Sequence, residues 1–199
     1  MNSIKEKTTS LIEINKSKFY CILTKINSID EVDEILSNIK LEYKGATHYC
    51  YAYIFEQTKR FNDDGEPNGT AGMPILNVLE NNKLDHVLAV VVRYFGGIKL
   101  GAGGLVRAYT NSVCESLNNA TIIRLTKGIQ VEIEFKYEDL KQIDYLLKDY
   151  EIVNKDYSDN IKYIINIPKD INIKEILNNF IINYKEIDNI LITKKEDII

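Results

Sequence analysis

The sequence predicts an α+β protein of two domains, residues 1–126 and residues 127–199. In the first part, a continuous apolar run leads into a glycine-rich loop and a helical pattern, which is typical of a buried strand followed by a helix. In the second part, strand and helix patterns follow in the order βαββαβ, the order of a ferredoxin-like unit. With 45% hydrophobic and 27% charged residues, the chain has the composition of a globular protein.

Charge is distributed unevenly between the two parts. Residues 1–126 hold 14 basic and 14 acidic residues, whereas residues 127–199 hold 11 basic and 15 acidic residues, and the net charge of the chain is −4. This is not the strongly basic composition of a dedicated nucleic-acid binder. Any contact with RNA must therefore come from a local basic patch.

Cysteine usage and hydropathy bear on the compartment. The chain has an odd number of cysteines, and the three lie far apart in the sequence: Cys21, Cys50 and Cys114. This suggests reduced thiols in a cytoplasmic protein. The chain has no C-x-x-C motif, which argues against a structural zinc site. Its longest apolar run is shorter than the roughly 20 residues that span a bilayer, and its N-terminus has no apolar signal region. We therefore expect no membrane association.

The first elements are a hairpin and a helix. Residues 8–14 and 18–26 have strand patterns around the turn Asn15-Lys16-Ser17. Ser28 with Glu31 fits a capping box, in which the serine caps a helix and the glutamate reaches back. The apolar spacing that follows predicts a helix that runs to about Leu41.

Residues 47–55 (THYCYAYIF) predict a strand with two distinct faces, because strand side chains alternate. The aromatic face could stack bases, but packing on neighbouring helices is the favoured interpretation. On the other face, His48 and Cys50 could be a ligand pair or a base with its nucleophile. A histidine that is hydrogen-bonded at the end of a strand is favoured over both.

Residues 61–74 (FNDDGEPNGTAGMP) form a loop with three carboxylates, Asp63, Asp64 and Glu66. These could make turns and caps, bind magnesium or another hard cation, or accept hydrogen bonds from a partner. Thr70 is a plausible N-cap for the helix that follows, with Pro74 in its first turn.

Residues 87–109 (VLAVVVRYFGGIKLGAGGLVRAY) are the central stretch of the first domain. Five of the chain's ten glycines lie between Gly96 and Gly104. Glycines gather where the backbone needs positive φ or where another group approaches closely, and a helix N-terminus attracts anions. A turn required only for packing is the alternative. In the helix that follows, we expect Cys114 to be a buried thiol.

The second domain has a compact pattern and no histidine, cysteine or catalytic constellation. Its predicted strands and helices occupy 129–135, 137–150, 153–157, 161–167, 173–181 and 184–193.

The two glycine-rich motifs together resemble the YigZ/IMPACT family, and the early EINKSKF and the H-x-C of His48 and Cys50 also fit it. The resemblance covers the whole chain. It implies a ribosomal-protein-S5-domain-2-like fold for the first domain and the small ferredoxin-like domain of bacterial members for the second. It also implies a link to translation. Eukaryotic relatives regulate translation during amino-acid starvation by binding an activator of a stress kinase, and nucleic-acid or ribosome binding has been proposed for bacterial members.

One departure from the family pattern stands out. Met73 occupies a position that is usually basic, which removes a possible phosphate contact, and Lys99 could compensate for it. The motif positions that carry over are Lys18, His48, Cys50, Asp63, Asp64, Gly65, Glu66, Pro67, Gly69, Thr70, Ala71, Gly72, Pro74, Arg93, Tyr94, Gly96, Gly97, Leu100, Gly101, Gly103, Gly104, Leu105, Arg107, Ala108 and Tyr109.

The resulting hypothesis is a translation-linked regulatory or binding protein without a cofactor. It would contact RNA, the ribosome or a translation-associated protein through a glycine-rich cleft in which the two loops converge. Basic side chains would hold phosphates and glycine backbone would supply N–H donors. The predicted ligand-binding residues are Lys18, His48, Thr70, Arg93, Tyr94, Gly96, Gly97, Lys99, Gly101, Gly103, Gly104 and Arg107.

An enzyme acting on a phosphorylated small molecule or nucleotide is the alternative. His48 would then be the acid–base group, and Asp63, Asp64 and Glu66 would hold a metal. The chain lacks the Walker A pattern, and Val106 occupies the last glycine position of a dinucleotide fingerprint. A metal-dependent peptidase is less favoured still, because two histidines and three clustered carboxylates do not make a dinuclear site.

Overall fold

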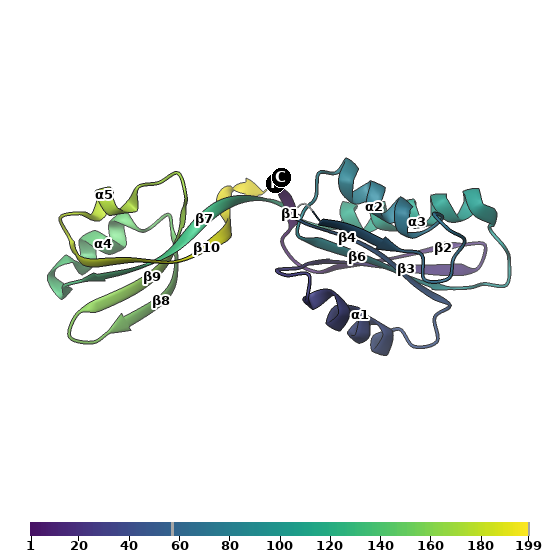
Figure 1. Ribbon diagram of the computed structural model, residues 1–199, viewed down its shortest axis with the longest axis horizontal. Helices are drawn as coiled ribbons and strands as arrows, with labels where there is room; N and C mark the ends of the chain where they lie inside the picture. The colour runs from purple at the N-terminus through teal and green to yellow at the C-terminus, as the bar shows by residue number, and fades with distance from the viewer. Residues whose placement is uncertain (57, 199) are drawn as a thin grey trace. The chain divides into compact units, whose positions relative to one another are not determined.

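The computed structural model describes residues 1–56 and 58–198, and its α+β architecture is as predicted (Figure 1). The chain divides into two compact units, Met1–Arg124 together with Ile198, and Leu125–Asp197. That residues 1–126 and 127–199 fold as independent domains stays a prediction.

A five-stranded antiparallel sheet forms the centre of the first unit, in the order β2-β3-β6-β4-β5. The continuous apolar run predicted as a buried strand is its middle strand, β6, buried from Val87 to Arg93. A strand with neighbours on both edges and helices on both faces needs apolar side chains on each face. The sheet consists of β2 (Thr8–Ile14), β3 (Ser17–Lys25), β4 (His48–Phe55), β5 (Thr58–Asn62) and β6 (Val87–Tyr94).

The hairpin between β2 and β3 turns through Asn15 and Lys16, which both have positive φ (48° and 63°). This is the geometry of the two-residue turn that matches the twist of paired strands. Ser17 therefore already belongs to β3 and pairs with Ile14.

Helices cover both faces of this sheet (Figure 1). Helix α1 (Glu31–Glu42) packs on one face, and α2 (Gly72–Asn81) and α3 (Gly101–Asn118) pack on the other. The interpretation of the aromatic face of β4 as a packing face is confirmed. Its members lie in the core on the α1 side: Tyr49, Tyr51, Tyr53 and Phe55.

Two predicted helix starts are wrong. The N-cap of α1 is Asp30 and not Ser28, and the Glu31 carboxylate accepts a hydrogen bond from the Asn27 N–H (3.1 Å). Helix α2 begins at Gly72 after Ala71, and the Thr70 hydroxyl donates to the Pro67 carbonyl (2.6 Å) instead of capping the helix. At α1 the glutamate of the predicted capping box bonds the Asn27 N–H instead of the Ser28 N–H, and at α2 the Asp63 carboxylate accepts from the Ala71 and Gly72 N–H groups.

Two strands and one surface position escaped prediction. Strand β1 (Asn2–Ile4) has only three residues, and β5 reads TKRFN, without the apolar alternation that indicates a strand. Cys114, expected to be buried, is exposed on α3. A helical stripe specifies which side faces the core only to within one residue position, and Cys114 lies next to the buried Val113.

The second unit has the predicted order βαββαβ. Its sheet order is β10-β7-β9-β8, and its core lies between the sheet and the two helices. Strand β7 begins earlier than predicted, because Ile122–Arg124 pairs with β1 in the first unit. The elements are β7 (Ile122–Phe135), the 3-10 turn η1 (Tyr137–Asp139), α4 (Leu140–Leu146), β8 (Glu151–Tyr157), β9 (Ile161–Pro168), α5 (Ile173–Leu177) and β10 (Ile181–Ile198).

Within the described ranges, the helices are all too short or too polar to cross a lipid bilayer.

Candidate functional site

Residues from three distant stretches meet at one end of the first unit's sheet. Strands β3 and β4 both run antiparallel to β6, so their first residues flank its last ones. Arg93 on β6 is paired with Phe19 on one side and His48 on the other, and Lys18 is paired with Tyr94. The sheet therefore brings four of the predicted residues, Lys18, His48, Arg93 and Tyr94, together at one end of its strands.

The glycine loop is hydrogen-bonded to the residues at this end of the sheet. The Phe95 N–H donates to the Thr47 hydroxyl (3.0 Å), and the Gly96 N–H donates to the Ser17 hydroxyl (3.1 Å). A side chain at Gly96 would collide with the Lys16 backbone, so glycine is required here by close approach. The connection is shorter than predicted: α3 begins at Gly101, so the last three predicted loop glycines, Gly101, Gly103 and Gly104, lie in its first turn.

Asp63 organises the second glycine loop. Its carboxylate accepts hydrogen bonds from three backbone N–H groups, those of Gly69 (2.9 Å), Ala71 (3.0 Å) and Gly72 (2.8 Å). An ionised acceptor at a helix N-terminus satisfies unpaired donors and interacts favourably with the helix dipole. Asp63 therefore performs the capping role that the sequence suggested for Thr70.

Asp64 attaches the same loop to β4. Its carboxylate accepts from the Tyr49 N–H (2.7 Å), and its carbonyl lies 2.8 Å from His48 Nδ1. This agrees with the favoured interpretation of His48, a hydrogen-bonded histidine at the end of a strand. The carbonyl fixes Nδ1 as the protonated nitrogen in the neutral ring, which leaves Nε2 as the acceptor.

Glu66 is a buried carboxylate that joins the two loops. Its Oε1 accepts from Arg93 Nη1 (2.6 Å) and from the Tyr109 hydroxyl (2.7 Å), and all three side chains are buried. The Arg93 guanidinium also lies over the rings of Phe19 and Phe95, 5.4 and 5.5 Å from their centroids. The second loop is thus linked to the end of β6 and to α3 by charge-assisted hydrogen bonds.

Two neutral groups complete this cluster. The Cys50 thiol donates to the Asp63 carbonyl (2.9 Å), and its sulfur lies 3.3 Å from the Tyr109 hydroxyl. Burial raises the pKa of the Cys50 thiol to about 12, and burial next to Cys50 and Glu66 raises the pKa of Tyr109 as well. Both groups are therefore protonated at neutral pH, and a Cys50 thiolate does not form for nucleophilic chemistry.

The three carboxylates named as candidate metal ligands do not converge in the described chain. The three carboxylates turn to three different partners: the α2 N-terminus, the Tyr49 N–H and the Arg93 guanidinium. His48 Nε2 lies 3.9 Å from the second Glu66 oxygen, beyond hydrogen-bonding distance. Residues 1–56 and 58–198 contain no group of three or more His, Cys, Asp or Glu side chains placed to hold a metal ion.

The exposed groups around the first loop are basic and apolar. Phe95 and Ile98 are 46% and 45% exposed, and Lys18, Lys99 and Arg107 are also exposed. The first turn of α3 carries no acidic residue that would oppose an anion. Arg93, in contrast, is committed to Glu66 and buried. We call Lys18, Phe95, Ile98, Lys99 and Arg107 the glycine-loop surface.

Sequence reasoning missed the roles of Tyr109 and Thr47. Tyr109 belongs to the apolar stripe of α3, and its hydroxyl is polar among buried neighbours, which indicates a buried partner. That this partner is Glu66, 43 positions away, follows only from the fold. Met73, at the position that is usually basic, is 39% exposed in the first turn of α2.

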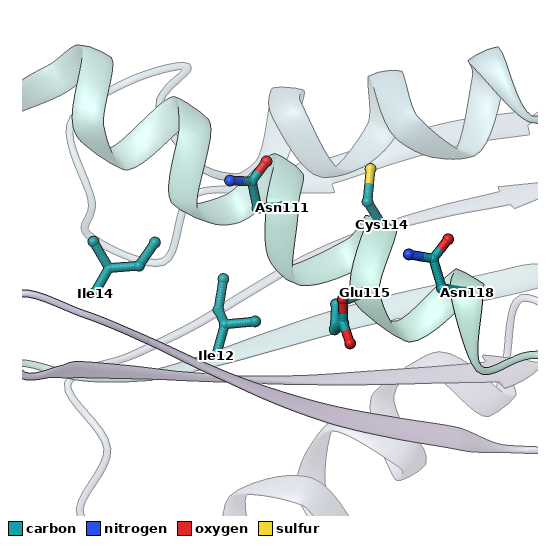
Figure 2. A pocket seen from close by; sticks show the side chains of 6 residues that line it. All are labelled: Ile12, Ile14, Asn111, Cys114, Glu115 and Asn118. Carbon is teal, nitrogen blue, oxygen red and sulfur yellow. The ribbon is translucent and has the colours of Figure 1, made fainter.

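A separate depression of about 400 Å³ lies between β2 and α3 (Figure 2). None of its lining residues belongs to the predicted site. They are Ile12, Ile14, Asn111, Cys114, Glu115 and Asn118.

Comparison with known proteins gives consistent results. The model of the Impact N-terminal domain matches residues 15–117. IMPACT family member YvyE of Bacillus subtilis is 39% identical over 171 residues, 81% of this chain and 76% of that protein. IMPACT family member YigZ of Escherichia coli is 37% identical over 156 residues, 75% of this chain and 76% of that protein.

The fold also has a close counterpart among solved structures. A crystal structure described as that of a hypothetical protein matches with a TM-score of 0.64 and 29% sequence identity. The match covers 98% of both chains.

Proposed function

The chain belongs to the IMPACT family, and on this premise we propose that it is a translation-linked binding protein of the cytoplasm. Its first unit would contact RNA, the ribosome or a translation-associated protein through the glycine-loop surface. The link to translation comes from the family, and the cytoplasm is supported by three unpaired thiols.

One observation carries the preference for binding over catalysis. The three carboxylates of the second loop bind β4, the N-terminus of α2 and Arg93 of β6, while Phe95 and Ile98 stay exposed among basic side chains. Exposed apolar side chains rimmed by charge mark interaction sites. Carboxylates that are engaged in this way act as structural supports: Asp63 and Asp64 hold the second loop, and the buried Glu66 holds Arg93 next to the loop that presents this surface.

The geometry supports two modes of contact. Lys18, Lys99 and Arg107 would contact phosphates or acidic side chains, and Phe95 would stack on a base or fill an apolar pocket. The positive charge of Lys18 is partly compensated, because Glu13 lies opposite it on β2. Lys99, in the loop itself, is therefore the better position for a test.

Recovery of partners from a cytosolic extract, with and without ribonuclease, tests the proposal. We expect ribosomal or translation-associated components to be retained by the full chain and to be reduced for Lys99→Glu. Lys5→Glu is the matched control, because Lys5 is an exposed lysine near the start of β2, at the opposite end of the sheet. Loss of retention after ribonuclease identifies RNA as the contact, and persistence identifies protein.

A salt titration separates direct RNA binding from the other modes. If the glycine-loop surface binds RNA, affinity for a single-stranded RNA should fall steeply with salt, and Lys99→Glu should reduce the slope. Retention of the same components by wild type, Lys99→Glu and Lys5→Glu would overturn the proposal that this surface makes the contact. Retention of no translation component would overturn the link to translation.

The enzyme alternative has no specific observation in its favour. His48 Nδ1 is bound to a backbone carbonyl, and the carboxylates that would serve it are engaged elsewhere. Thermal-shift screening with nucleotides and divalent metals checks a phosphorylated ligand, and dipeptide hydrolysis with manganese checks a peptidase.

A further inference from the structure

The sheet of the second unit has one face without helices. Helices α4 and α5 lie on the same side of the sheet (Figure 1), and their core takes the inward side chains of β7 and β9. The opposite face is formed by the alternate residues of the same strands, which are only partly buried. Sheets of this kind present one face to the surroundings unless a partner covers it.

Strand register defines which residues share this face. Lys162, Ile164 and Asn166 of β9 each have a directly opposite residue on β7 and on β8, and such residues point to the same side. Two hydrogen bonds run across the strands: Gln130 donates to Asn166 (3.1 Å), and Asn166 donates to Glu151 (2.9 Å). On β7, β8 and β9, the open sheet face comprises Gln130, Glu132, Glu134, Glu151, Asn154, Asp156, Lys162, Ile164 and Asn166.

The charge of this face is one-sided. On β7, β8 and β9 it carries four carboxylates and one ammonium group, Lys162. On these three described strands, none of the four carboxylates forms an ion pair, and Glu134 and Glu151 accept only from the neutral amides of Asn160 and Asn166. Like charges gathered on one surface attract a partner of opposite sign and repel one of the same sign.

We propose that the open sheet face binds a lysine- and arginine-rich protein segment. The carboxylates would pair with its cationic groups, and Ile164 at the centre would receive their aliphatic stems, because long basic side chains pack their methylenes on apolar surface. Nucleic acid is excluded from this face by charge. The second unit would then bind protein independently of what the glycine-loop surface binds.

Fluorescence anisotropy with the full chain tests this assignment, using labelled deca-lysine and deca-uridylate as probes at low and physiological salt. The variant Glu132→Gln/Asp156→Asn removes two face charges from side chains that form no hydrogen bond or ion pair with the described residues. Its matched control, Glu138→Gln/Asp149→Asn, removes the same charges from exposed residues beside α4. Both variants keep the side-chain volumes, and circular dichroism confirms folding.

We expect the dissociation constant for deca-lysine to rise by about three- to tenfold for the face variant and to change little for the control. Equal weakening in both variants would overturn the proposal, because attraction would then follow net charge and not this face. Unchanged binding in the face variant would overturn it too. Tighter binding of deca-uridylate by the face variant alone would support exclusion of nucleic acid, whereas loss of that binding would assign the face to RNA.

Discussion

Glu66 is the residue on which the arrangement of both glycine loops depends. It is buried between Arg93 and Tyr109, so its removal leaves a buried guanidinium without a counter-charge. The Arg93 Nε atom already has no partner within the described residues, which makes this group more dependent on the carboxylate. Breaking a buried pair by removing one member is far more costly than replacing both.

We predict that Glu66→Ala lowers the free energy of unfolding by about 3–5 kcal/mol. Urea denaturation followed by circular dichroism measures the loss. The control is Glu80→Ala, which removes a surface pair with Lys59 (2.8 Å) and should cost less than about 1 kcal/mol. In the double variant Glu66→Leu/Arg93→Met, much of the stability should return. Equal losses for Glu66→Ala and Glu80→Ala would contradict a structural role for the buried pair.

The glycine loop shows at the scale of an element why neighbouring glycines are not equivalent. Gly96 lies against the turn between β2 and β3, and a methyl group there has no space. Gly97 has a positive φ of 85° with open space around it. A side chain there would not collide with any neighbour, and its only cost would be the strain of a non-glycine residue at positive φ. A loop pattern in the sequence predicts that glycine is needed, but the tertiary neighbours decide which constraint applies.

We expect Gly96→Ala to destabilise the protein by about 3 kcal/mol or more, because the turn and the loop must separate. Gly97→Ala should cost only about 1–2 kcal/mol, the typical strain of a non-glycine residue at positive φ. Thermal or urea unfolding of the two variants gives the comparison. A larger loss for Gly97→Ala would show that backbone conformation, and not close approach, is the dominant requirement of this loop.

At the scale of the whole molecule, the hydrophobic cores of the two units share no residues among those that the structure describes. Residues of the first unit form the cores on the two faces of its sheet, and residues 129–184 form the core of the second. Each core is assembled from within one unit, which is the condition for units that unfold separately. This supports the proposed division into domains near residue 126.

We predict that Tyr163→Ala unfolds the second unit first. The side chain is fully buried, and truncating a buried aromatic residue costs about 3–5 kcal/mol. Hydrogen exchange followed by mass spectrometry should show loss of amide protection over Ile161–Pro168, while Val87–Tyr94 stays protected. Phe19→Ala, at a fully buried position of the first unit, is the reciprocal control. Simultaneous loss of protection in both strands would establish one cooperative unit.

The sequence by itself determined the order of the elements other than β1 and β5, the βαββαβ pattern of the second unit, the middle strand Val87–Tyr94 and the family. These follow from hydrophobic periodicity and from long motifs, which are local properties of the chain. The short strand Asn2–Ile4 and the polar strand Thr58–Asn62 lacked that local signal. The first is a strand because it pairs with the distant Ile122–Arg124, and the second because it pairs with the preceding strand β4.

Only the tertiary structure decided what the polar residues do. Asp63, Asp64 and Glu66 are close in sequence, which left turns and caps, a cation site and contact with a partner all open, and in the structure each carboxylate faces a different donor. Hydrogen bonds and ion pairs are short-ranged and directional, so their partners follow from how strands and loops meet, and spacing along the chain does not specify them. The same meeting of β3, β4 and β6 buries Arg93 and leaves Lys99 and Phe95 exposed on the surface proposed for binding.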